Sequence, residues 1–419
     1  MRRTPRAALA AAVLVTAAAL APAAAADPGP DAPTKVRPEV PSSVRVATYN
    51  ASLNRAGAGD LVEDLTEGDD VQAAAIAQVL QITRPDIVLL NEFDHDDDGL
   101  AVDLFRENYL EVSQRGEEPL RYPYAYTAPV NTGVPSGLDL DNDGTVGGPG
   151  DALGFGFFPG QFGMVVLSRY PIDTDEVRTF QNFRWADMPG ALLPDDPAVA
   201  GAGDWYDDAE LAALPLSSKS HWDVPVQVWG RTVHVLAAHP TPPTFDGVED
   251  RNGRRNHDET RLWADYVAGG RDAGYIYDDD GGRGGLAAND RFVIVGDYNA
   301  DPLDGDSVPG AIDQLLENPR VRDPEPTSTG AVEAALTQGG ANLLHRGDNA
   351  LDTADFSDDP APGNLGVDYA LPSKHLPVAG SGVFWPAADE PGSELTGQFP
   401  FPTSDHRLVW VDLRLVGRR

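Results

Sequence analysis

Short apolar runs alternate with polar segments along most of this chain, and these runs have the length of buried strands. Residues 70–83 and 255–268 instead repeat apolar side chains at helical spacing, and Arg84-Pro85 ends the first predicted helix. The predicted strands are residues 44–49, 86–90, 162–168, 224–229, 231–238, 291–296, 366–371 and 407–416, with a hairpin turn at Gly230. Strands and helices do not alternate strictly, so we expect a two-sheet α/β or α+β sandwich.

The N-terminal segment has the layout of a secretory signal. Three arginines precede an apolar run over residues 8–20, and Ala24-Ala25-Ala26 precedes Asp27, so we expect cleavage after Ala26 and a secreted protein. An uncleaved membrane anchor is the alternative, but the run is short for a membrane span and no later segment reaches 18 consecutive apolar residues. Residues 27–42 are predicted to be a flexible lead-in, and residues 43–419 one domain with long loop insertions.

Amino-acid composition limits the kinds of metal site and substrate that this chain can be expected to have. The chain has no cysteine, which excludes disulfides and thiolate metal sites and leaves oxygen-rich cation sites. Its formal net charge of −35 repels polyphosphates and disfavours the basic footprint of a nucleic-acid-binding protein. The charge could equally serve solubility alone. We expect a phosphorylated substrate, if there is one, to be small, and we expect a monomer because no coiled coil or other assembly element is recognisable.

Polar side chains cluster at one end of most predicted strands. If these ends converge, they line a pocket with oxygen ligands and two histidines, which suits Mg²⁺, Mn²⁺ or Ca²⁺ better than Zn²⁺. Each motif alone is better explained as a turn or a cap. The motifs are Thr48-Tyr49-Asn50, Asn91-Glu92, Ala238-His239, Asp297-Tyr298-Asn299, Asp368 and Ser404-Asp405-His406.

Taken together and in this order, these motifs resemble those of the endonuclease/exonuclease/phosphatase superfamily, which includes deoxyribonucleases, neutral sphingomyelinases and inositol-polyphosphate phosphatases. The resemblance extends over residues 44–415, and the closing Ser404-Asp405-His406 is its most specific part. It implies a deoxyribonuclease-like, four-layer sandwich of two mixed sheets flanked by helices. It also implies hydrolysis of a phosphodiester or phosphomonoester by a metal-activated water.

The resemblance also implies a role for each matching residue. Glu92 is expected to be the main ligand of a catalytic Mg²⁺ or Mn²⁺, with Asn50 and Asp405 nearby. Asp297 is expected to position or deprotonate the attacking water, and Asn299 to hold that water or a phosphoryl oxygen. The resemblance assigns the remaining roles to His406, Asp368 and His239. His406 is expected to contact the phosphate, with its tautomer fixed and its pKa raised by Asp368, and His239 to stabilise charge on the phosphoryl group or the leaving oxygen.

Basic residues offer further candidates for substrate binding. Lys219 and His221 lie in a run of three serines just before a predicted strand and could grip a second phosphate, although a solvated loop explains them as well. Arg169 is a third candidate. An extracellular nuclease would gather Arg169, Arg254 and Arg255 beside the pocket.

Two further alternatives depend on other segments. A phospholipid-headgroup phosphodiesterase would need an exposed apolar rim, for which Phe155, Phe157 and Phe158 are candidates. A non-catalytic cation-binding protein would be favoured if Asp297 and His406 lay more than about 8 Å apart.

The aspartates Asp139, Asp141 and Asp143 alternate and are followed by a glycine, like the start of a calcium loop. Gly150 stands where an EF-hand has its twelfth-position glutamate, so the segment predicts at most a simpler structural Ca²⁺ site.

Overall fold

The computed structural model of the protein describes residues 43–199, 201 and 203–415. The predicted secretory signal, residues 1–26, and the predicted lead-in, residues 27–42, lie outside the described residues. Within the described part, no helix combines the length and the apolar character that a membrane crossing requires.

Six strands form the first sheet in the order β12-β13-β1-β2-β4-β3. The two central strands, β1 and β2, run parallel, and the pairs β1–β13, β12–β13, β2–β4 and β3–β4 are antiparallel. The strands are β1 (Val44–Leu53), β2 (Ile87–Phe93), β3 (Tyr124–Tyr126), β4 (Met164–Ser168), β12 (Val378–Val383) and β13 (Val409–Leu413).

Five strands form the second sheet in the order β11-β8-β7-β6-β5. Its parallel pair is β7–β8, and the remaining pairs are antiparallel. The predicted hairpin is present between β6 and β7, where Trp229 and Gly230 both have positive φ, as a tight two-residue turn requires. The strands are β5 (Arg178–Thr179), β6 (His221–Val228), β7 (Arg231–Ala238), β8 (Phe292–Asp297) and β11 (Asp368–Pro372), while β9 (Ala354–Asp355) and β10 (Asn364–Leu365) pair separately.

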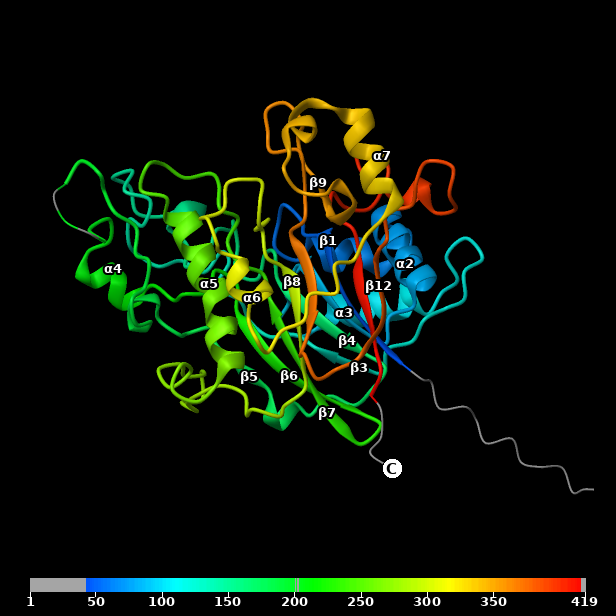
Figure 1. Ribbon diagram of the computed structural model, residues 1–419, viewed down its shortest axis with the longest axis horizontal. Coiled ribbons are helices and arrows are strands. Elements are labelled where there is room, and N and C mark those ends of the chain that lie inside the picture. Colours follow the sequence, from blue (N-terminus) through cyan, green and yellow to red (C-terminus); the bar gives the residue numbers. More distant parts are fainter. Residues whose placement is uncertain (1–42, 200, 202, 416–419) are drawn as a thin grey trace, which may run out of the picture. The chain divides into compact units, whose positions relative to one another are not determined.

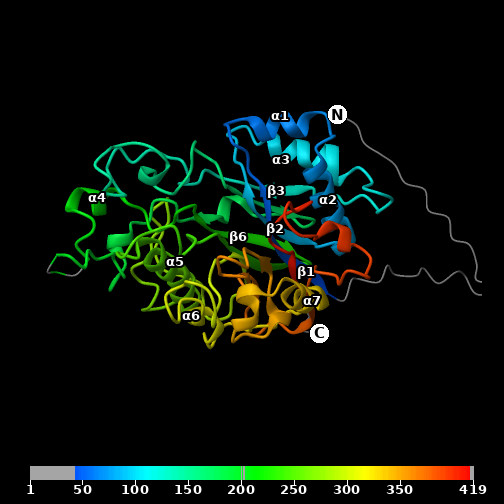
Figure 2. The same ribbon diagram turned by 90° about the horizontal axis from the view of Figure 1, so that it is seen from above.

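The two sheets pack face to face, and each carries helices on its outer face (Figures 1 and 2). Side-chain alternation explains this order of layers, because successive residues of a strand point to opposite faces. In β8, Val293 and Val295 pack in the core between the sheets, whereas Phe292 and Ile294 pack toward the helix that covers the second sheet. The predicted four-layer sandwich of two mixed sheets is therefore confirmed.

The helices on the first sheet are α1 (Asp60–Thr66), α2 (Val71–Thr83) and α3 (Leu100–Phe105), and those on the second are α5 (Arg251–Ala268) and α6 (Asp313–Leu316) (Figure 2). Two others, α4 (Asp208–Ala213) and α7 (Thr329–Gln338), belong to connecting segments. Asp70 caps α2 by accepting a hydrogen bond from the backbone N–H of Ala73 at 2.6 Å. The predicted helix over 255–268 in fact begins at Arg251.

The strand registers bring the polar strand ends to one edge of the sandwich. Asn50 of β1 lies beside Asn91 of β2, and Asp297 at the end of β8 lies beside Asp368 at the start of β11. Carboxyl ends of parallel strands meet at the same edge, and an antiparallel neighbour begins there. The fold therefore gathers the predicted site residues in one place.

Candidate active site

One oxygen of Asp297 is the centre of the candidate site. This Oδ2 atom accepts a hydrogen bond from Asn50 Nδ2 at 3.0 Å, and it lies 3.4 Å from His239 Nε2 and 3.6 Å from His406 Nε2. Burial alone would raise the pKa of Asp297, but His406 and His239 outweigh it and hold the pKa of this carboxyl well below its usual range. Asp297 is therefore a carboxylate at neutral pH.

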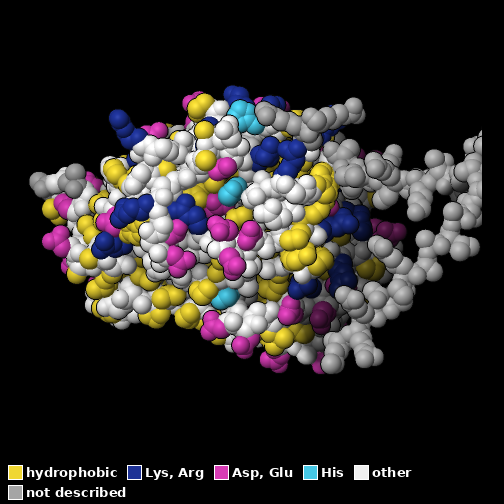
Figure 3. Space-filling view, turned by 90° about the horizontal axis from the view of Figure 1, so that it is seen from below, with side chains coloured by type: hydrophobic (Ala, Val, Ile, Leu, Met, Phe, Trp, Pro, Cys, Tyr) yellow, Lys and Arg dark blue, Asp and Glu magenta, His cyan; other side chains and the backbone are white. Residues whose placement is uncertain are grey.

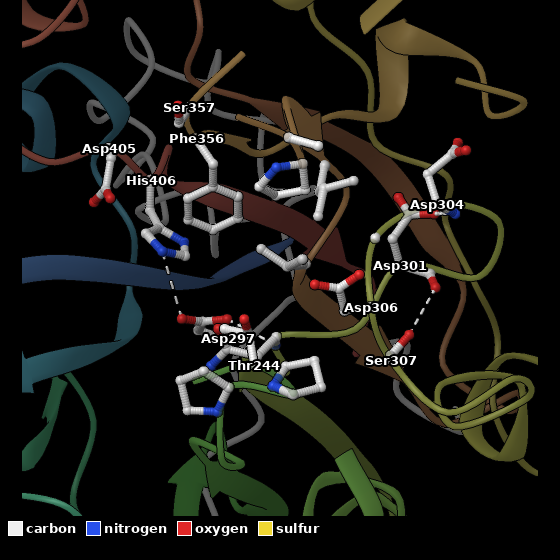
Figure 4. A pocket seen from close by; sticks show the side chains of 18 of the residues that line it. Thr244, Asp297, Asp301, Asp304, Asp306, Ser307, Phe356, Ser357, Asp405 and His406 are labelled. Carbon is white, nitrogen blue, oxygen red and sulfur yellow. Dashed lines mark hydrogen bonds and ion pairs between the residues drawn. The ribbon is translucent and has the colours of Figure 1, made fainter. Parts of the chain in front are cut away.

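A second carboxylate orients His406 from the other side of its ring. Asp368 Oδ2 lies 2.9 Å from His406 Nδ1 and also accepts a hydrogen bond from the Thr353 hydroxyl at 2.8 Å. Burial of the imidazole lowers its pKa, but the charges of Asp368 and Asp297 prevail and raise the pKa of His406 well above its ordinary value. Figure 4 shows His406 and Asp297 facing each other across the cavity. His406 can thus present a positive charge to a phosphate.

Replacing Asp368 by Asn should move the alkaline limb of the kcat/KM profile to lower pH. The carboxylate favours the protonated imidazole, so its removal lowers the pKa of His406, and the charged form needed for phosphate contact is lost earlier as pH rises. The profile is measured with one substrate from pH 5 to 10. Asp223→Asn is the matched control, because Asp223 is bonded to His234 at 2.7 Å, outside the cavities described below, and its loss should leave the limb in place. An unmoved limb in Asp368→Asn would contradict the assignment.

His239 differs from His406 in its charge. It is buried at 3% exposure, and burial together with the neighbouring ammonium of Lys219 lowers its pKa, so the ring is neutral at pH 7. Asn299 follows Asp297 with its backbone in the left-handed region, φ +51°, and its side chain donates to the Pro240 carbonyl at 3.1 Å. Its own N–H donates to Asp297 Oδ1 at 2.9 Å, so Asn299 holds the carboxylate in place from the other side.

Glu92 presents a carboxylate that fits a hard divalent cation. Its oxygens accept from Asn50 Nδ2 at 3.1 Å and Asn54 Nδ2 at 2.9 Å, and no cationic side chain of the described residues pairs with it. Its φ of +56° is unusual for a residue with a long side chain, and such backbone strain is often found at functional sites. One carboxylate with water and phosphate oxygens around the ion is a typical Mg²⁺ arrangement. Asn50 lies beside Glu92 as predicted.

Asp405 is half-buried and lines the cavity near His406 (Figure 4), but its role as a ligand stays a prediction. The acidic and histidine atoms that approach one another within 4.8 Å at this site belong to Asp297, Asp368 and His406. The same spacing is met by the oxygens of Asp139, Asp141 and Asp143, so these three side chains converge as a calcium loop requires. A calcium ion there also stays a prediction.

Two cavities meet at the candidate site. The first, here the His406 cavity, has a volume of about 570 Å³ and includes Asp297, Asn299 and His406 in its lining. The second, here the Lys219 cavity, has a volume of about 590 Å³ and includes Lys219 and His239 in its lining. Both cavities are lined by Glu92, Pro242, Thr244 and Phe245.

The structure places two of the three predicted substrate-binding residues away from both cavities. Arg169 pairs with Asp86 at 2.9 Å at the opposite edge of the first sheet, because β4 runs antiparallel to β2. His221 lines neither cavity, since its Nδ1 bonds Ser217 Oγ and its Nε2 bonds the Glu259 carbonyl. Only Lys219 lies at the site.

Sequence reasoning missed the residue that fixes the Ser404-Asp405-His406 turn. Arg407 is 1% exposed, and its guanidinium donates to the carbonyls of Ser404 and His406 and to Asp355 Oδ2. It also lies over the ring of Trp385 at 4.4 Å. The sequence did carry a signal for this buried ion pair, because Arg407 stands between His406 and the apolar residues of the next strand.

Replacing Arg407 by Met should lower the free energy of unfolding by about 3 to 5 kcal/mol, because it leaves the buried Asp355 carboxylate without its cationic partner. Chemical denaturation measures this directly. Arg121→Met is the control, since Arg121 is 77% exposed and pairs only at the surface, where the loss should stay below about 1 kcal/mol. Equal losses in both variants would contradict the structural role of Arg407.

Solved structures and one protein family resemble this chain. An endonuclease/exonuclease/phosphatase from Beutenbergia cavernae is 18% identical, with a TM-score of 0.48 over 90% of this chain and 72% of that chain. A sphingomyelinase C from Streptomyces griseocarneus is 16% identical, with a TM-score of 0.45 over 88% of this chain and 99% of that chain. A mannosyl-6-phosphatase from Bacteroides thetaiotaomicron is 14% identical, with a TM-score of 0.44 over 88% of this chain and 99% of that chain. Among curated proteins no match was found. The sequence pattern of the Endonuclease/Exonuclease/phosphatase family matches residues 47–406, so the chain belongs to that family.

Proposed function

We propose that this protein is an exported, divalent-metal-dependent phosphoesterase that hydrolyses a small phosphodiester or phosphomonoester. The observation that carries the proposal is the arrangement around Asp297. Its Oδ2 atom lies within 3.6 Å of two histidine nitrogens and accepts from the Asn50 amide, which also donates to the carboxylate of Glu92. A non-catalytic cation-binding protein would not need this arrangement, and the separation between Asp297 and His406 is far below the limit of about 8 Å set for one water and one phosphate.

Each residue has a defined task in the proposed reaction. Asp297 orients a water molecule and accepts its proton, and Asn299 holds the Asp297 carboxylate in place for this task. His406, kept cationic by Asp368, contacts a phosphoryl oxygen and stabilises its charge. A cation at Glu92 would supply Lewis-acid polarisation of the phosphoryl group. Mg²⁺ and Mn²⁺ are the ions that the oxygen ligands favour.

The proposal is tested by assaying the purified mature chain on bis-p-nitrophenyl phosphate, p-nitrophenyl phosphate and plasmid DNA, each with Mg²⁺, Mn²⁺ or Ca²⁺ and with a chelator. We expect turnover of a small ester that the chelator abolishes and that Mg²⁺ or Mn²⁺ restores. Absence of turnover with every substrate and metal would contradict the proposal for small esters.

A nuclease is disfavoured by the placement of the basic side chains. Arg169 lies at the far edge of the sheet, and Arg254 and Arg255 donate hydrogen bonds to backbone carbonyls. Asp301, Asp304 and Asp306 line the His406 cavity and would repel a polyanion (Figure 4). On the face in Figure 3, which lies away from the site, basic side chains also form separate small groups among acidic and apolar ones.

A phospholipid-headgroup phosphodiesterase is the second candidate. Phe155 and Phe157 are 58% and 67% exposed, and Phe245, which borders both cavities, is 87% exposed. Phe158 is only half-exposed and is the weakest member of the predicted rim. Exposed aromatic rings beside a polar cavity are favourable for contact with a lipid surface. Hydrolysis of phospholipid vesicles at a higher kcat/KM than bis-p-nitrophenyl phosphate would establish this candidate.

Export is proposed on the N-terminal sequence alone. The exported protein should begin at Asp27, which N-terminal mass spectrometry of the secreted product tests. Recovery of the full-length chain in the cell membrane would contradict cleavage.

A further inference from the structure

Lys219 is a buried lysine whose ammonium has no partner. It is 6% exposed, and its Nζ makes no hydrogen bond or ion pair with any residue that the structure describes. The other lysine in that part of the chain, Lys374, is exposed. An ammonium that is mostly buried and has no protein partner is costly, because it has lost much of its hydration and gained no ion pair in return. Such a group is kept when a ligand completes its contacts.

Hydrogen bonds fix the backbone of the segment that brings Lys219 to the Lys219 cavity. The Lys219 carbonyl accepts from the N–H of Asn131 at 2.9 Å, and the N–H of Ser218 donates to Glu259 Oε1 at 2.6 Å. This segment directly precedes β6. The first residue of β6 pairs with Ala238, which is next to His239 in the sequence. The side chain therefore lines the cavity together with His239 and Glu92. Burial also lowers the pKa of the Lys219 ammonium, which the carboxylates of Glu259, Glu92 and Asp297 only partly oppose.

Each of the two cavities contributes one histidine to the reaction centre. His406 lines the first and His239 the second, and both rings approach the same Oδ2 atom of Asp297. Displacement at phosphorus requires the attacking and leaving oxygens to lie roughly in line on opposite sides of the phosphorus. If Asp297 holds the water in the His406 cavity, the Lys219 cavity, with His239 and Lys219, is the space left for the departing oxygen.

We propose that the substrate is a phosphodiester whose leaving group occupies the Lys219 cavity, and that the Lys219 ammonium donates a proton to the departing oxygen. This rests on the proposed function and assigns its substrate class and its acid. The bond from the water oxygen to phosphorus forms, and the water proton passes to Asp297. The bond from phosphorus to the leaving oxygen breaks, and that oxygen keeps the electron pair and takes the proton from Lys219.

Cavity size and charge both favour a diester. The two ester groups need two spaces, and the cavities that meet at Glu92 have similar volumes of about 570 and 590 Å³. A diester carries one negative charge where a monoester carries up to two, so it is less repelled by the acidic walls. Phe155, Tyr206 and Leu140 together with Arg251 line the Lys219 cavity, which suits a leaving alcohol with an apolar part and a polar group. Such alcohols are poor leaving groups and need a proton.

The test compares Lys219→Met with wild type on methyl phenyl phosphate and methyl p-nitrophenyl phosphate. p-Nitrophenolate leaves readily without a proton, whereas phenolate is a poorer leaving group and needs the acid more. We expect Lys219→Met to lose about 10²-fold or more in kcat/KM on the phenyl ester and under about tenfold on the nitrophenyl ester. Wild type should prefer methyl p-nitrophenyl phosphate to the monoester p-nitrophenyl phosphate. Lys374→Met is the matched control and should change neither rate, because this lysine is exposed.

The outcomes separate the two proposals. If wild type hydrolyses none of these esters, the proposed function fails. If wild type is active but Lys219→Met loses the same factor on both diesters, Lys219 does not protonate the leaving group. A preference of wild type for the monoester would overturn the diester assignment. A thermal melt of each variant shows whether it is folded. Activity that remains on the nitrophenyl ester shows the same, so a loss of chemistry can be distinguished from a loss of folding.

Discussion

Replacing Asp297 by Asn is expected to reduce kcat/KM by about 10³-fold or more while the protein stays folded. Asn has nearly the shape of Asp but carries no charge and cannot take a proton from water. The substitution also removes the negative charge shared by the two histidines, which lie 3.4 and 3.6 Å away. The water would lose both its orientation and its base, and His406 would lose one of the two carboxylates that raise its pKa.

The measurement is steady-state kinetics on the best small ester at saturating metal, with circular dichroism to check folding. Asp272→Asn is the matched control, because Asp272 is exposed and bonds to no described residue, and its activity should equal that of wild type. A loss of less than about tenfold in Asp297→Asn would show that the reaction does not use this carboxylate.

Replacing Glu92 by Gln should shift metal-stimulated turnover to much higher metal concentrations and remove the tightest binding of Mn²⁺. A neutral amide oxygen attracts a hard dication much less than a carboxylate does. Among the described residues, Asp297 is the only other carboxylate that accepts a hydrogen bond from the Asn50 side chain. Isothermal titration calorimetry measures the binding and a metal titration of the rate measures the function. We expect at least about a hundredfold more metal for half-maximal rate.

Glu63→Gln provides the control for Glu92→Gln. Glu63 is exposed on α1, so its replacement removes the same charge from the chain without touching the cavities. If both variants needed more metal to the same extent, the effect would come from the net charge of the protein. If Glu92→Gln kept the wild-type metal dependence, the cation would have to bind elsewhere, and Asp405 would be the next ligand to test.

The sequence could predict the site because its residues are fixed by the strands. Asn50, Asp297 and Asp368 lie at the ends of apolar runs that can be recognised without a structure, and strand register then brings them to one edge. The same logic located His239 one residue beyond β7. Periodicity also predicted α2 and the hairpin at Gly230, because a capping aspartate and a positive-φ glycine are local signals.

The cavities could not be predicted in this way, because loops form them. Pro242, Thr244 and Phe245 reach the site from the segment after β7, and the side chain of Phe356 lies 5.4 Å from the His406 ring. No periodicity reports where such segments lie. Arg169 and His221 were assigned from charge and residue type alone, and neither property says at which edge of a sheet a side chain lies or whether backbone carbonyls already satisfy it.

The strand β12 was missed for a related reason. Its sequence, Val378–Val383, is interrupted by glycines and is only partly buried, so it lacks the apolar alternation of a typical strand. It pairs with β13 because β13 offers a free edge beside β1. Tertiary pairing decided its conformation, and the local sequence alone was insufficient.

The central claim is that a water held at Asp297 attacks phosphorus. Hydrolysis of methyl p-nitrophenyl phosphate in ¹⁸O-labelled water, with Mn²⁺ present, tests it most directly through the mass of the products. The account predicts one ¹⁸O in the phosphate product, none in the released alcohol, and no label incorporation above background with Asp297→Asn. Label in the alcohol, or wild-type incorporation in the Asp297→Asn variant, would contradict it.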